Sequence, residues 1–427
     1  MRELALGVDF GTSGVRLAVN DRDGQTLIEQ AVPYPGPFEL PETWRLGFIE
    51  LLNQLPAELK QQLRCISLAG TSGTLLLCDE QGHLLPGPLG QALPYHQACE
   101  EQLPEVQRLL GPVSHPASQA SGSLARALRL IEQSRSIAQT TKPLIRHQAD
   151  WLMGWLLGDW RWGEEGNNLR LGWDLEGQHW LGDLSRACWA ESLPDIVASG
   201  TVLGPVAPAV ASALGLTESC QVVAGTTDAN ASVLAADPAA DEGITVLGST
   251  LVLKQFVPAP IHGVGLSCHR VNGRWLLGGA SNTGAAILGR YFDASMLEEL
   301  SRQIDPEHNS GLKLRPLLCQ GERFPVDDPQ LEPVLEPRPV SDSRFLQALL
   351  EGITAIEKEG WQRLREVGAP PIQRITTLGG GAHNAQWRLL RERMLGLPIR
   401  NRPKLSAARG MARLAQGKME AFRSGSA

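Results

Sequence analysis

The sequence predicts an α/β protein of two domains. A length of 427 residues suggests two or three domains at roughly 150 residues each, and 42% hydrophobic residues suffice for buried cores. One motif, a strand followed by a polar turn and a second strand, occurs near residue 10 and again near residue 248, with segments of mixed α and β pattern between the two copies. The repetition suggests two domains of one ancestral design, although a single pair of matches is a weak repeat signal.

The first copy of the motif lies at the start of the chain. Residues 4–9, 15–20 and 26–32 have the pattern of strands, and the polar turns between them are residues 11–14 and 21–24. Short turns join neighbouring strands that run in opposite directions. We therefore expect an antiparallel meander at the N-terminus.

The rest of the chain mixes strand and helix patterns. Strands of the second copy are expected at residues 244–247, 251–256, 265–271 and 275–278. Other short strands are expected at residues 65–69, 221–224, 374–378 and 397–400, with an apolar run at 74–78. Helices are expected at residues 123–132, 148–157, 229–236, 384–395 and 406–415. The proline-rich and acidic stretch 321–343 predicts a long surface connection.

Charge and cysteine content restrict the classes of function. The chain has 39 basic and 46 acidic side chains, a formal charge of −7, which disfavours nucleic acid as a partner. No apolar run approaches the roughly 20 residues that span a bilayer, and a strand beginning near Leu4 leaves no room for a signal peptide. The seven cysteines are scattered and form no C-x-x-C pair, which argues against a disulfide scaffold or a zinc site. We expect a soluble, cytoplasmic protein that does not bind membranes.

Three polar loops leave predicted strands and share one physical property. Small residues in a tight turn expose backbone N–H groups, and neighbouring hydroxyl groups add donors, so such a loop can hold phosphate oxygens. For any one of these loops taken alone, the sequence favours an ordinary glycine turn at a strand end over a phosphate site. The chain contains neither G-x-x-x-x-G-K-[ST] nor G-x-G-x-x-G, so a Walker loop and a Rossmann fingerprint are excluded. The loops are Gly11, Thr12 and Ser13; Gly248, Ser249 and Thr250; and Gly379, Gly380 and Gly381.

Two aspartates adjoin these loops. Asp9 ends the first strand, where a carboxylate next to phosphate requires a divalent cation between them. Asp228 lies at a strand-to-helix junction among small residues, where an ionised carboxylate can take the proton from an attacking hydroxyl group. The alternatives are a turn-capping role for Asp9 and a helix N-cap role for Asp228.

Tryptophan is concentrated in one part of the chain. Seven of the eleven tryptophans lie between Trp151 and Trp189. Such a cluster can be a platform on which a sugar stacks, but buried tryptophans more often fill a core, and the sequence favours packing.

The loops and aspartates together resemble the FGGY carbohydrate kinases, a branch of the actin-like and heat-shock-chaperone-like ATPases. The resemblance spans nearly the whole chain and rests on Asp9 to Ser13 with Arg16, on residues 225–228 (GTTD), on residues 248–250 (GST), and on residues 379–381 (GGG) with Asn384. Residues 147–151 (HQADW), 167–168 (NN) and 278–282 (GGASN) further resemble a short xylulokinase-like branch of cyanobacteria and plants, which is associated with phosphorylation of D-ribulose.

The resemblance implies two ribonuclease H-like domains, the actin-like ATPase fold, with a central cleft. It implies a sugar-binding domain over residues 1–230, a nucleotide-binding domain over 231–405, and a closing helix within 406–427 that packs back on the first domain. By analogy Asp9 holds Mg²⁺ and Asp228 is the catalytic base. The implied nucleotide-binding residues are Gly11, Thr12, Ser13, Gly248, Ser249, Thr250, Gly380, Gly381, Asn384 and Trp387. The implied sugar-binding residues are Asp9, Thr12, Ser72, Gln97 and Asp228.

One segment departs from the family pattern. Many members carry an aromatic, Asn, Asp, any residue, Arg signature for sugar hydroxyls, whereas this chain has residues 95–99 (YHQAC). Both charged ligands are absent, but Gln97 can still donate and accept hydrogen bonds. For His96 a solvent-facing position is favoured over a contact with the substrate. The departure makes xylulose or glycerol specificity doubtful and leaves a short ketose such as D-ribulose favoured by the branch resemblance.

The resemblance therefore predicts an ATP-dependent sugar kinase that uses Mg²⁺ and acts on a small ketose. The alternative is a nucleotide-driven conformational or regulatory ATPase of the same fold, without a sugar acceptor, which the altered 95–99 segment supports. The sequence does not determine the oligomeric state.

Overall fold

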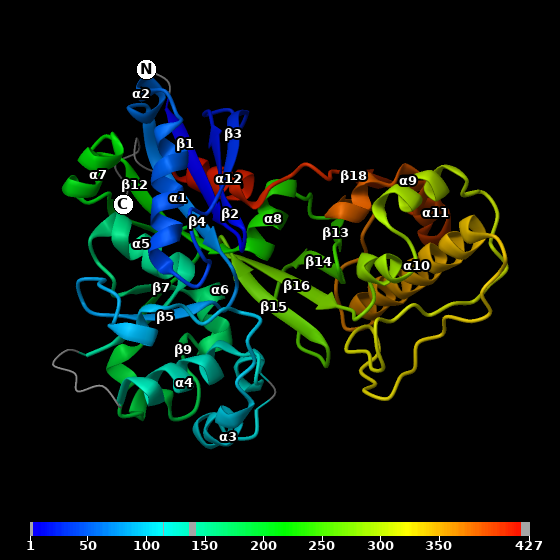
Figure 1. Cartoon of the computed structure of the whole chain (residues 1–427), viewed down its shortest axis with the longest axis horizontal. Helices are drawn as coiled ribbons and strands as arrows, with labels where there is room; N and C mark the ends of the chain where they lie inside the picture. The colour runs from blue at the N-terminus through cyan, green and yellow to red at the C-terminus, as the bar shows by residue number, and fades with distance from the viewer. Residues whose placement is uncertain (1–2, 114, 136–141, 420–427) are drawn as a thin grey trace. The chain divides into compact units, whose positions relative to one another are not determined.

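The computed structural model describes residues 3–113, 115–135 and 142–419, and the chain folds as two compact units (Figure 1). The units are built from discontinuous segments. Unit 1 comprises Met1–Ala235, Arg270–Gly273 and Ser406–Ala427, and unit 2 comprises Ala236–His269 and Arg274–Leu405. Over the described residues, no helix combines the length and the apolar character that crossing a membrane requires.

Unit 1 is organised around a mixed sheet of six strands. The predicted antiparallel meander is confirmed, since β2 pairs antiparallel with both β1 and β3. The sheet then continues in parallel from β1 to β4 and from β4 to β12. In spatial order its strands are β11 (Val202–Pro205), β12 (Gln221–Thr227), β4 (Leu63–Gly70), β1 (Leu4–Phe10), β2 (Gly14–Asn20) and β3 (Thr26–Pro33).

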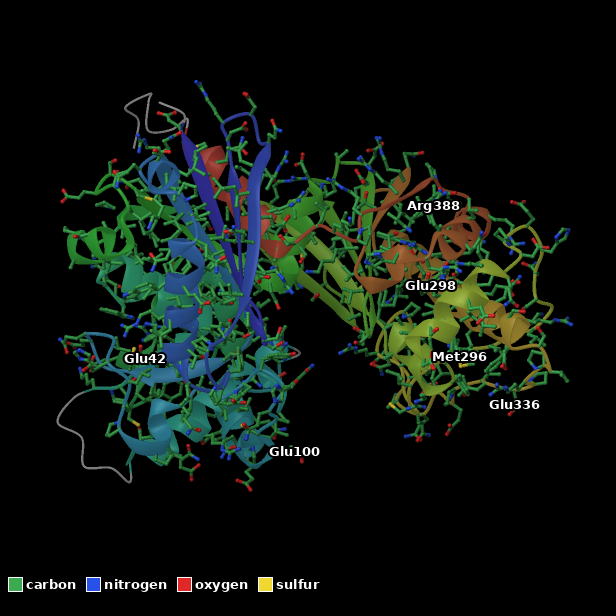
Figure 2. All side chains as sticks on the ribbon, turned by 45° about the horizontal axis from the view of Figure 1, so that its top comes forward. Glu42, Glu100, Met296, Glu298, Glu336 and Arg388 are labelled. Carbon is green, nitrogen blue, oxygen red and sulfur yellow. The ribbon has the colours of Figure 1, made fainter. Side chains whose placement is uncertain are left out.

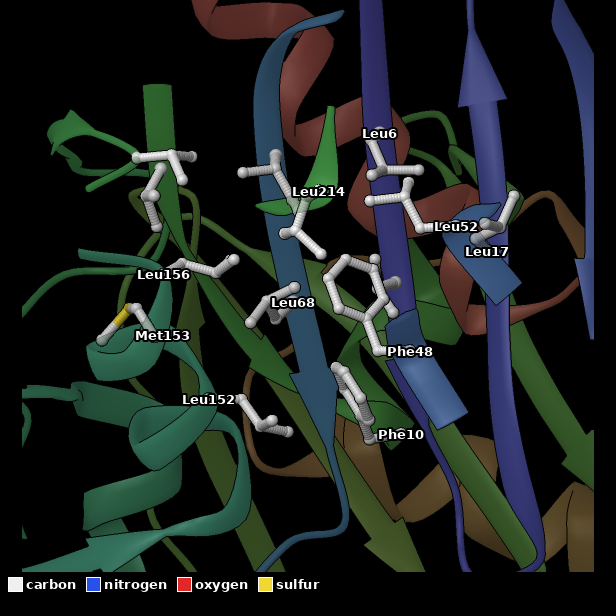
Figure 3. Close-up of a cluster of buried hydrophobic side chains, with 14 of the residues drawn as sticks. Leu6, Phe10, Leu17, Phe48, Leu52, Leu68, Leu152, Met153, Leu156 and Leu214 are labelled. Carbon is white, nitrogen blue, oxygen red and sulfur yellow. The ribbon is translucent and has the colours of Figure 1, made fainter. Parts of the chain in front are cut away.

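Helices cover both faces of this sheet. One face packs against α1 (Pro41–Asn53), α5 (Gln148–Leu157) and α7 (Pro208–Leu214), whose apolar side chains form a single core cluster with Leu6, Phe10 and Leu68 (Figure 3). Alternation along β1 sends its other side chains to the opposite face. The two helices α8 (Asp228–Ala236) and α12 (Ala407–Met419) contribute to the apolar cluster on that face.

The closing helix α12 approaches β1 very closely. A Cβ atom on Gly7 would lie 2.0 Å from the backbone nitrogen of Ala412, and one on Gly410 would lie 1.9 Å from the carbonyl oxygen of Ala231. Glycine at both positions therefore allows backbone-to-backbone packing of α12 on the sheet and on α8. Residues 420–427 of the predicted closing segment lie outside the described residues.

A second layer of unit 1 surrounds a smaller core cluster. The predicted apolar run is the strand β5, which pairs with β6, and the predicted helix at 123–132 is α4. Of the seven tryptophans between 151 and 189, six pack into or against two of the core clusters of unit 1, and the ring of Trp173 contacts Trp180. The prediction that this cluster serves packing is confirmed. The remaining α-helices and strands of unit 1 are α2 (Ala57–Lys60), β5 (Leu75–Cys78), α3 (Leu103–Leu110), α4 (Ser123–Arg135), β6 (Leu144–His147), β7 (Trp162–Glu164), α6 (Glu165–Asn168), β8 (Trp173–Asp174), β9 (His179–Trp180) and β10 (Asp195–Val197).

Unit 2 repeats the strand arrangement of unit 1. Its sheet also has six strands, in which β13, β14 and β16 are antiparallel neighbours and β13, β17 and β18 are parallel ones. In spatial order the strands are β15 (Leu266–Val271), β16 (Arg274–Ala280), β14 (Leu251–Val257), β13 (Glu242–Leu247), β17 (Arg374–Leu378) and β18 (Ile399–Asn401). All strands predicted in this part of the chain are confirmed, with ends that differ by one or two residues.

Two helices pack on the sheet of unit 2, and a third packs on those two. The first two are α10 (Asp342–Glu366) and α11 (Ala385–Leu395), and the third is α9 (Ala294–Arg302). The start of α11 is set by Asn384, whose Oδ1 accepts a hydrogen bond from the N–H of Trp387, and its end by Gly396 in the left-handed conformation. Residues 321–341, all of which the structure describes, contain no helix or strand, as predicted for a surface connection, but Phe324 anchors the connection in the core.

Acidic side chains lie on the surface of both units. Glu100 of unit 1 and Glu298 and Glu336 of unit 2 are exposed and point away from the ribbon (Figure 2). Their positions agree with a chain whose formal charge is negative.

Candidate active site

Three parallel strands of unit 1 end at the same edge of the sheet. In the strand register Asp9 of β1 is opposite Ala69 of β4, and Ala69 is opposite Thr226 of β12. The carboxyl ends of parallel strands are where open α/β sheets bind ligands, because the loops that leave them converge there. The loop after β1, the turn after β4 and the start of α8 therefore lie next to one another.

Asp9 is a buried carboxylate at this edge. Its exposed fraction is 4%, and the guanidinium of Arg16 lies 3.5 Å from Oδ2. Among the described residues Oδ1 finds no hydrogen-bond partner. Burial, and then the nearby charge of Asp228, raise the pKa of Asp9 to about 7, while Arg16 opposes the shift. The carboxyl group thus carries a proton at neutral pH about as often as a negative charge.

Asp228 lies in the first turn of α8 and is half-buried. Its Oδ1 accepts a hydrogen bond from the N–H of Ala229, so the carboxylate faces the positive end of the helix dipole. Its charge raises the pKa of Asp9, which shows that the two carboxyl groups interact. The fold of unit 1 therefore brings together the aspartates predicted for the metal and for the base, from positions 219 residues apart in the sequence (228 minus 9).

The loop after β1 presents hydroxyl groups to solvent. Thr12 and Ser13 are exposed, and the backbone of the loop is fixed by a hydrogen bond from Gly11 N–H to Gly14 O. The hydroxyl group of Tyr34 donates a hydrogen bond to the carbonyl oxygen of Gly11 over 2.8 Å. The loop is thus held from behind while its hydroxyl groups stay free to contact a ligand.

The turn after β4 places Ser72 half-buried at the same edge. Next to it, Thr71 donates from both its N–H and its hydroxyl group to Oε1 of Gln148, over 2.9 and 2.8 Å. Gln97 is half-buried on the following segment, and its neighbour His96 is exposed, so the solvent-facing interpretation of His96 is confirmed. Gln148 belongs to the segment 147–151 that resembles the xylulokinase-like branch, but its local sequence does not indicate a contact with Thr71, which is 77 residues away.

Two predicted nucleotide loops meet inside unit 2. A Cβ atom on Gly379, whose φ is +84°, would lie 2.7 Å from the carbonyl oxygen of Leu247, the residue before Gly248. A Cβ atom on Gly284 would lie 2.3 Å from the carbonyl oxygen of Ser249. Glycine is therefore required for the loops to pack backbone against backbone. Ser249 is exposed and Gly248 and Thr250 are half-buried, and the N–H of Gly248 donates to the carbonyl oxygen of Thr250, which closes the turn.

The triple-glycine loop and the start of α11 contain four of the predicted nucleotide residues, Gly380, Gly381, Asn384 and Trp387. Gly380 is exposed, and no atom would lie within 4 Å of an added Cβ, so a ligand can approach its backbone. The Nδ2 group of the cap residue Asn384 donates to Ser301 over 2.8 Å. Trp387 differs from the expectation that it lines an adenosine pocket. Its side chain is 1% exposed, its Nε1 donates to Thr354, and its ring packs behind Gly381.

A buried ion pair lies beneath these loops. Arg391 of α11 donates to both carboxylate oxygens of Glu357 of α10, over 2.7 and 2.6 Å, and both side chains are at most 1% exposed. Thr245 of β13 donates to the same carboxylate, and Arg391 donates to Thr377 of β17. Both threonines lie on the strands that lead into the loops, so the pair fixes the ends of those strands. No local pattern indicates this pair, because Glu357 and Arg391 are 34 residues apart in the sequence.

The residues at the edge of unit 1 fit a divalent cation. Among the described residues no group of three His, Cys, Asp or Glu side chains could enclose a metal ion. The carboxylate of Asp9 is buried near a second carboxylate, and its Oδ1 has no hydrogen-bond partner among the described residues, so a cation beside Oδ1 would favour its ionised form in addition to Arg16. Mg²⁺ commonly uses one or two carboxylates together with waters and phosphate oxygens of a substrate. Asp9, with Asp228 nearby, matches that donor set.

The raised pKa of Asp9 predicts a pH-dependent stability. Between about pH 4 and pH 7 folded Asp9 keeps a proton that the unfolded chain releases, so this residue lowers stability as the pH rises through that window. Asp9→Asn removes the titration. We expect its free energy of unfolding, relative to the wild type, to rise by about 2–4 kcal/mol from pH 4 to pH 8. Urea unfolding without nucleotide or metal measures it, with the exposed Asp23→Asn as control; equal rises in both variants would contradict the assignment.

Comparisons with known proteins agree with this geometry. Residues 244–417 match the model of the C-terminal domain of the FGGY family of carbohydrate kinases. The chain is 24% identical to xylulose kinase of Escherichia coli over 96% of this chain and 89% of that protein. It is 23% identical to xylulose kinase of Lactococcus lactis over 94% and 86% of the two chains. These matches confirm the predicted resemblance.

Solved structures show the same fold. A xylulose kinase from Rhodospirillum rubrum superposes with a TM-score of 0.80 at 19% identity, covering 99% of this chain and 90% of that one. A glycerol kinase from Plasmodium falciparum, solved with ADP, superposes with a TM-score of 0.77 at 17% identity, covering 99% and 92%. The predicted fold class, two domains of the actin-like ATPase type, is confirmed.

Proposed function

Residues 244–417 carry the C-terminal domain of the FGGY family of carbohydrate kinases, and from this premise we propose that the protein transfers the γ-phosphate of ATP to a hydroxyl group of a small ketose, a pentulose such as D-ribulose. The enzyme class is that of a carbohydrate kinase. The observation that supports this reaction best is the pair Asp9 and Asp228, two interacting carboxyl groups at the carboxyl edge of one sheet.

On the acceptor side, Asp228 is the proposed general base. Its carboxylate is half-buried at a helix start and accepts a hydrogen bond from the N–H of Ala229, and an ionised carboxylate at this position can take the proton of a sugar hydroxyl. Phosphoryl transfer leaves little covalent work for the protein, so alignment of that hydroxyl with the γ-phosphate is the main contribution. Ser72 and Gln97 would hold the other hydroxyl groups of the sugar.

On the donor side, backbone N–H and hydroxyl groups would hold the nucleotide. The proposed phosphate contacts are Thr12 and Ser13 in the loop after β1, and residues 248–250 with Gly380 and Gly381 in the glycine loops after β13 and β17. Asn384, at the start of α11, would contact the adenosine. Trp387 would act from the core, by supporting Gly381 and not by touching the base. Mg²⁺, held through Asp9, would neutralise charge on the phosphate oxygens.

The choice of sugar rests on three considerations. The relatives found in the comparisons are named xylulose kinases, which favours a pentulose. The branch resemblance of residues 147–151 favours D-ribulose among pentuloses. Residues 95–99 lack the charged sugar ligands of many family members, which favours a substrate bound through neutral donors and acceptors.

A coupled assay of ADP release, with mass detection of the product, tests the proposal. D-ribulose, D-xylulose, glycerol and a blank without sugar are compared at saturating ATP and Mg²⁺. We expect ADP release and a phosphorylated pentulose with D-ribulose at the highest kcat/KM. ADP release that is independent of sugar, with no phosphorylated product, would overturn the proposal in favour of an actin-like or chaperone-like ATPase.

A further inference from the structure

A buried arginine lies behind the sugar side of unit 1. Arg126 of α4 is 0% exposed, and its guanidinium donates to four backbone carbonyl oxygens: Gly73 over 2.8 Å, Tyr95 over 2.9 Å, and Gln97 and Ser121 over 3.0 Å. In the part of the chain that the structure describes, no carboxylate forms an ion pair with it. Burial lowers its pKa to about 10, so the side chain is still charged at neutral pH. Its charge is therefore balanced by carbonyl dipoles alone.

These carbonyl groups belong to separate segments. Gly73 follows Ser72 in the turn after β4, whereas Tyr95 and Gln97 belong to the segment that replaces the sugar signature of the family. A charged, planar guanidinium fixes the directions of all its acceptors at once, because each N–H bond has a set orientation. Arg126 thus joins the Ser72 turn and the 95–97 segment into one rigid arrangement.

The absence of a side chain at Gly73 allows the contact between its carbonyl group and Arg126. Its φ is +99°, and a Cβ atom there would lie 2.6 Å from Nη2 of Arg126. Any side chain at position 73 would therefore both strain the backbone and displace the guanidinium. The glycine allows Arg126 to reach the carbonyl group next to Ser72.

A second set of contacts holds the other side of the turn. Gln148 accepts both hydrogen bonds of Thr71, and the hydroxyl groups of Thr71 and Thr74 are 2.7 Å apart. The N–H of Tyr95 donates to the hydroxyl group of Thr74 over 3.2 Å, which ties the two segments together again. Ser72 therefore lies between two fixed neighbours and is the half-buried residue of the turn.

We infer that Arg126 is a positioning residue for the acceptor sugar: it fixes Ser72 and Gln97 relative to each other and so sets affinity for the sugar without affecting the nucleotide. The inference rests on the proposed function. It also accounts for the altered 95–99 segment, because the organising positive charge comes from α4 and not from an arginine within the segment. Polar groups that must match several sugar hydroxyls lose selectivity when their spacing changes.

Steady-state kinetics of Arg126→Met and Arg126→Lys test the inference. We expect Arg126→Met to raise the KM for the sugar by about 10- to 100-fold, since small displacements of positioning groups have effects of this order, while the KM for ATP changes less than about 2-fold. Arg126→Lys keeps the charge but not the planar fork, so it should recover part of the loss.

Arg146→Met is the matched control. Arg146 is also a buried arginine, 1% exposed, and it too donates to backbone carbonyl oxygens, those of Trp160, Ile145 and Ser192. Its removal should lower the melting temperature as Arg126→Met does, yet leave the sugar KM near the wild-type value. An unchanged sugar KM in Arg126→Met, or an equal rise in Arg146→Met, would overturn the inference. Absence of sugar-dependent turnover in the wild type would instead overturn the proposed function.

Discussion

Asp228→Asn is expected to lower kcat for sugar phosphorylation by about 10²- to 10⁴-fold, the usual contribution of a general base. The amide keeps the size of the side chain and can still accept the hydrogen bond from Ala229, so the start of α8 should persist. What is lost is the capacity to take a proton from the acceptor hydroxyl. Asp228→Ala should lose activity to about the same extent.

Two further measurements make the result specific to catalysis. ATP binding, followed by the shift in melting temperature on adding nucleotide, should be nearly unchanged in Asp228→Asn. Asp293→Asn is the matched control, since Asp293 also starts a helix and accepts a hydrogen bond from Met296, but in unit 2. Undiminished turnover in Asp228→Asn would remove this residue from the mechanism.

Glu357→Gln is expected to destabilise unit 2 by about 3–5 kcal/mol, because it leaves the charge of Arg391 buried without a counter-charge. The two side chains share two short hydrogen bonds and connect α10 and α11 to Thr245 and Thr377. Since these threonines precede the nucleotide loops, we expect the KM for ATP to rise more than the KM for the sugar. Urea unfolding and steady-state kinetics measure the two effects.

The double variant Glu357→Gln with Arg391→Met separates charge from packing. If the loss comes from an unpaired buried charge, removing Arg391 as well should restore much of the stability. A double variant that is less stable than Glu357→Gln, or a single variant within about 0.5 kcal/mol of the wild type, would show that the pair does not stabilise unit 2 in this way.

The strands and most of the site loops could be predicted because their signals are local. The meander of β1, β2 and β3 and its counterpart in unit 2 follow from alternating apolar residues and polar turns, which need no information from the rest of the chain. Asn384 and Gly396 mark the ends of α11 by their own chemistry. The long helix α10 was not predicted, although Ser341 caps its start through a hydrogen bond from Arg344.

The residues that support the loops could not be predicted in the same way. Trp387 was expected to contact the nucleotide and is a core residue, because its burial depends on α10 packing against α11. Arg126 and Gln148 were not singled out, since their partners Gly73 and Thr71 are 53 and 77 residues away in the sequence. A local pattern carries no information about such partners.

The sequence alone determined nearly all strands of the two large sheets and some of the helices, where the glycine turns fall, and that carboxyl and hydroxyl groups accompany those turns. These properties depend on backbone preferences and on neighbours within a few residues. Only the tertiary structure decided that Asp9 and Asp228 share one edge of a sheet, that burial shifts the pKa of Asp9, and that an unpaired arginine joins two loops. Desolvation and charge interaction depend on distance in space, which the order of residues does not give.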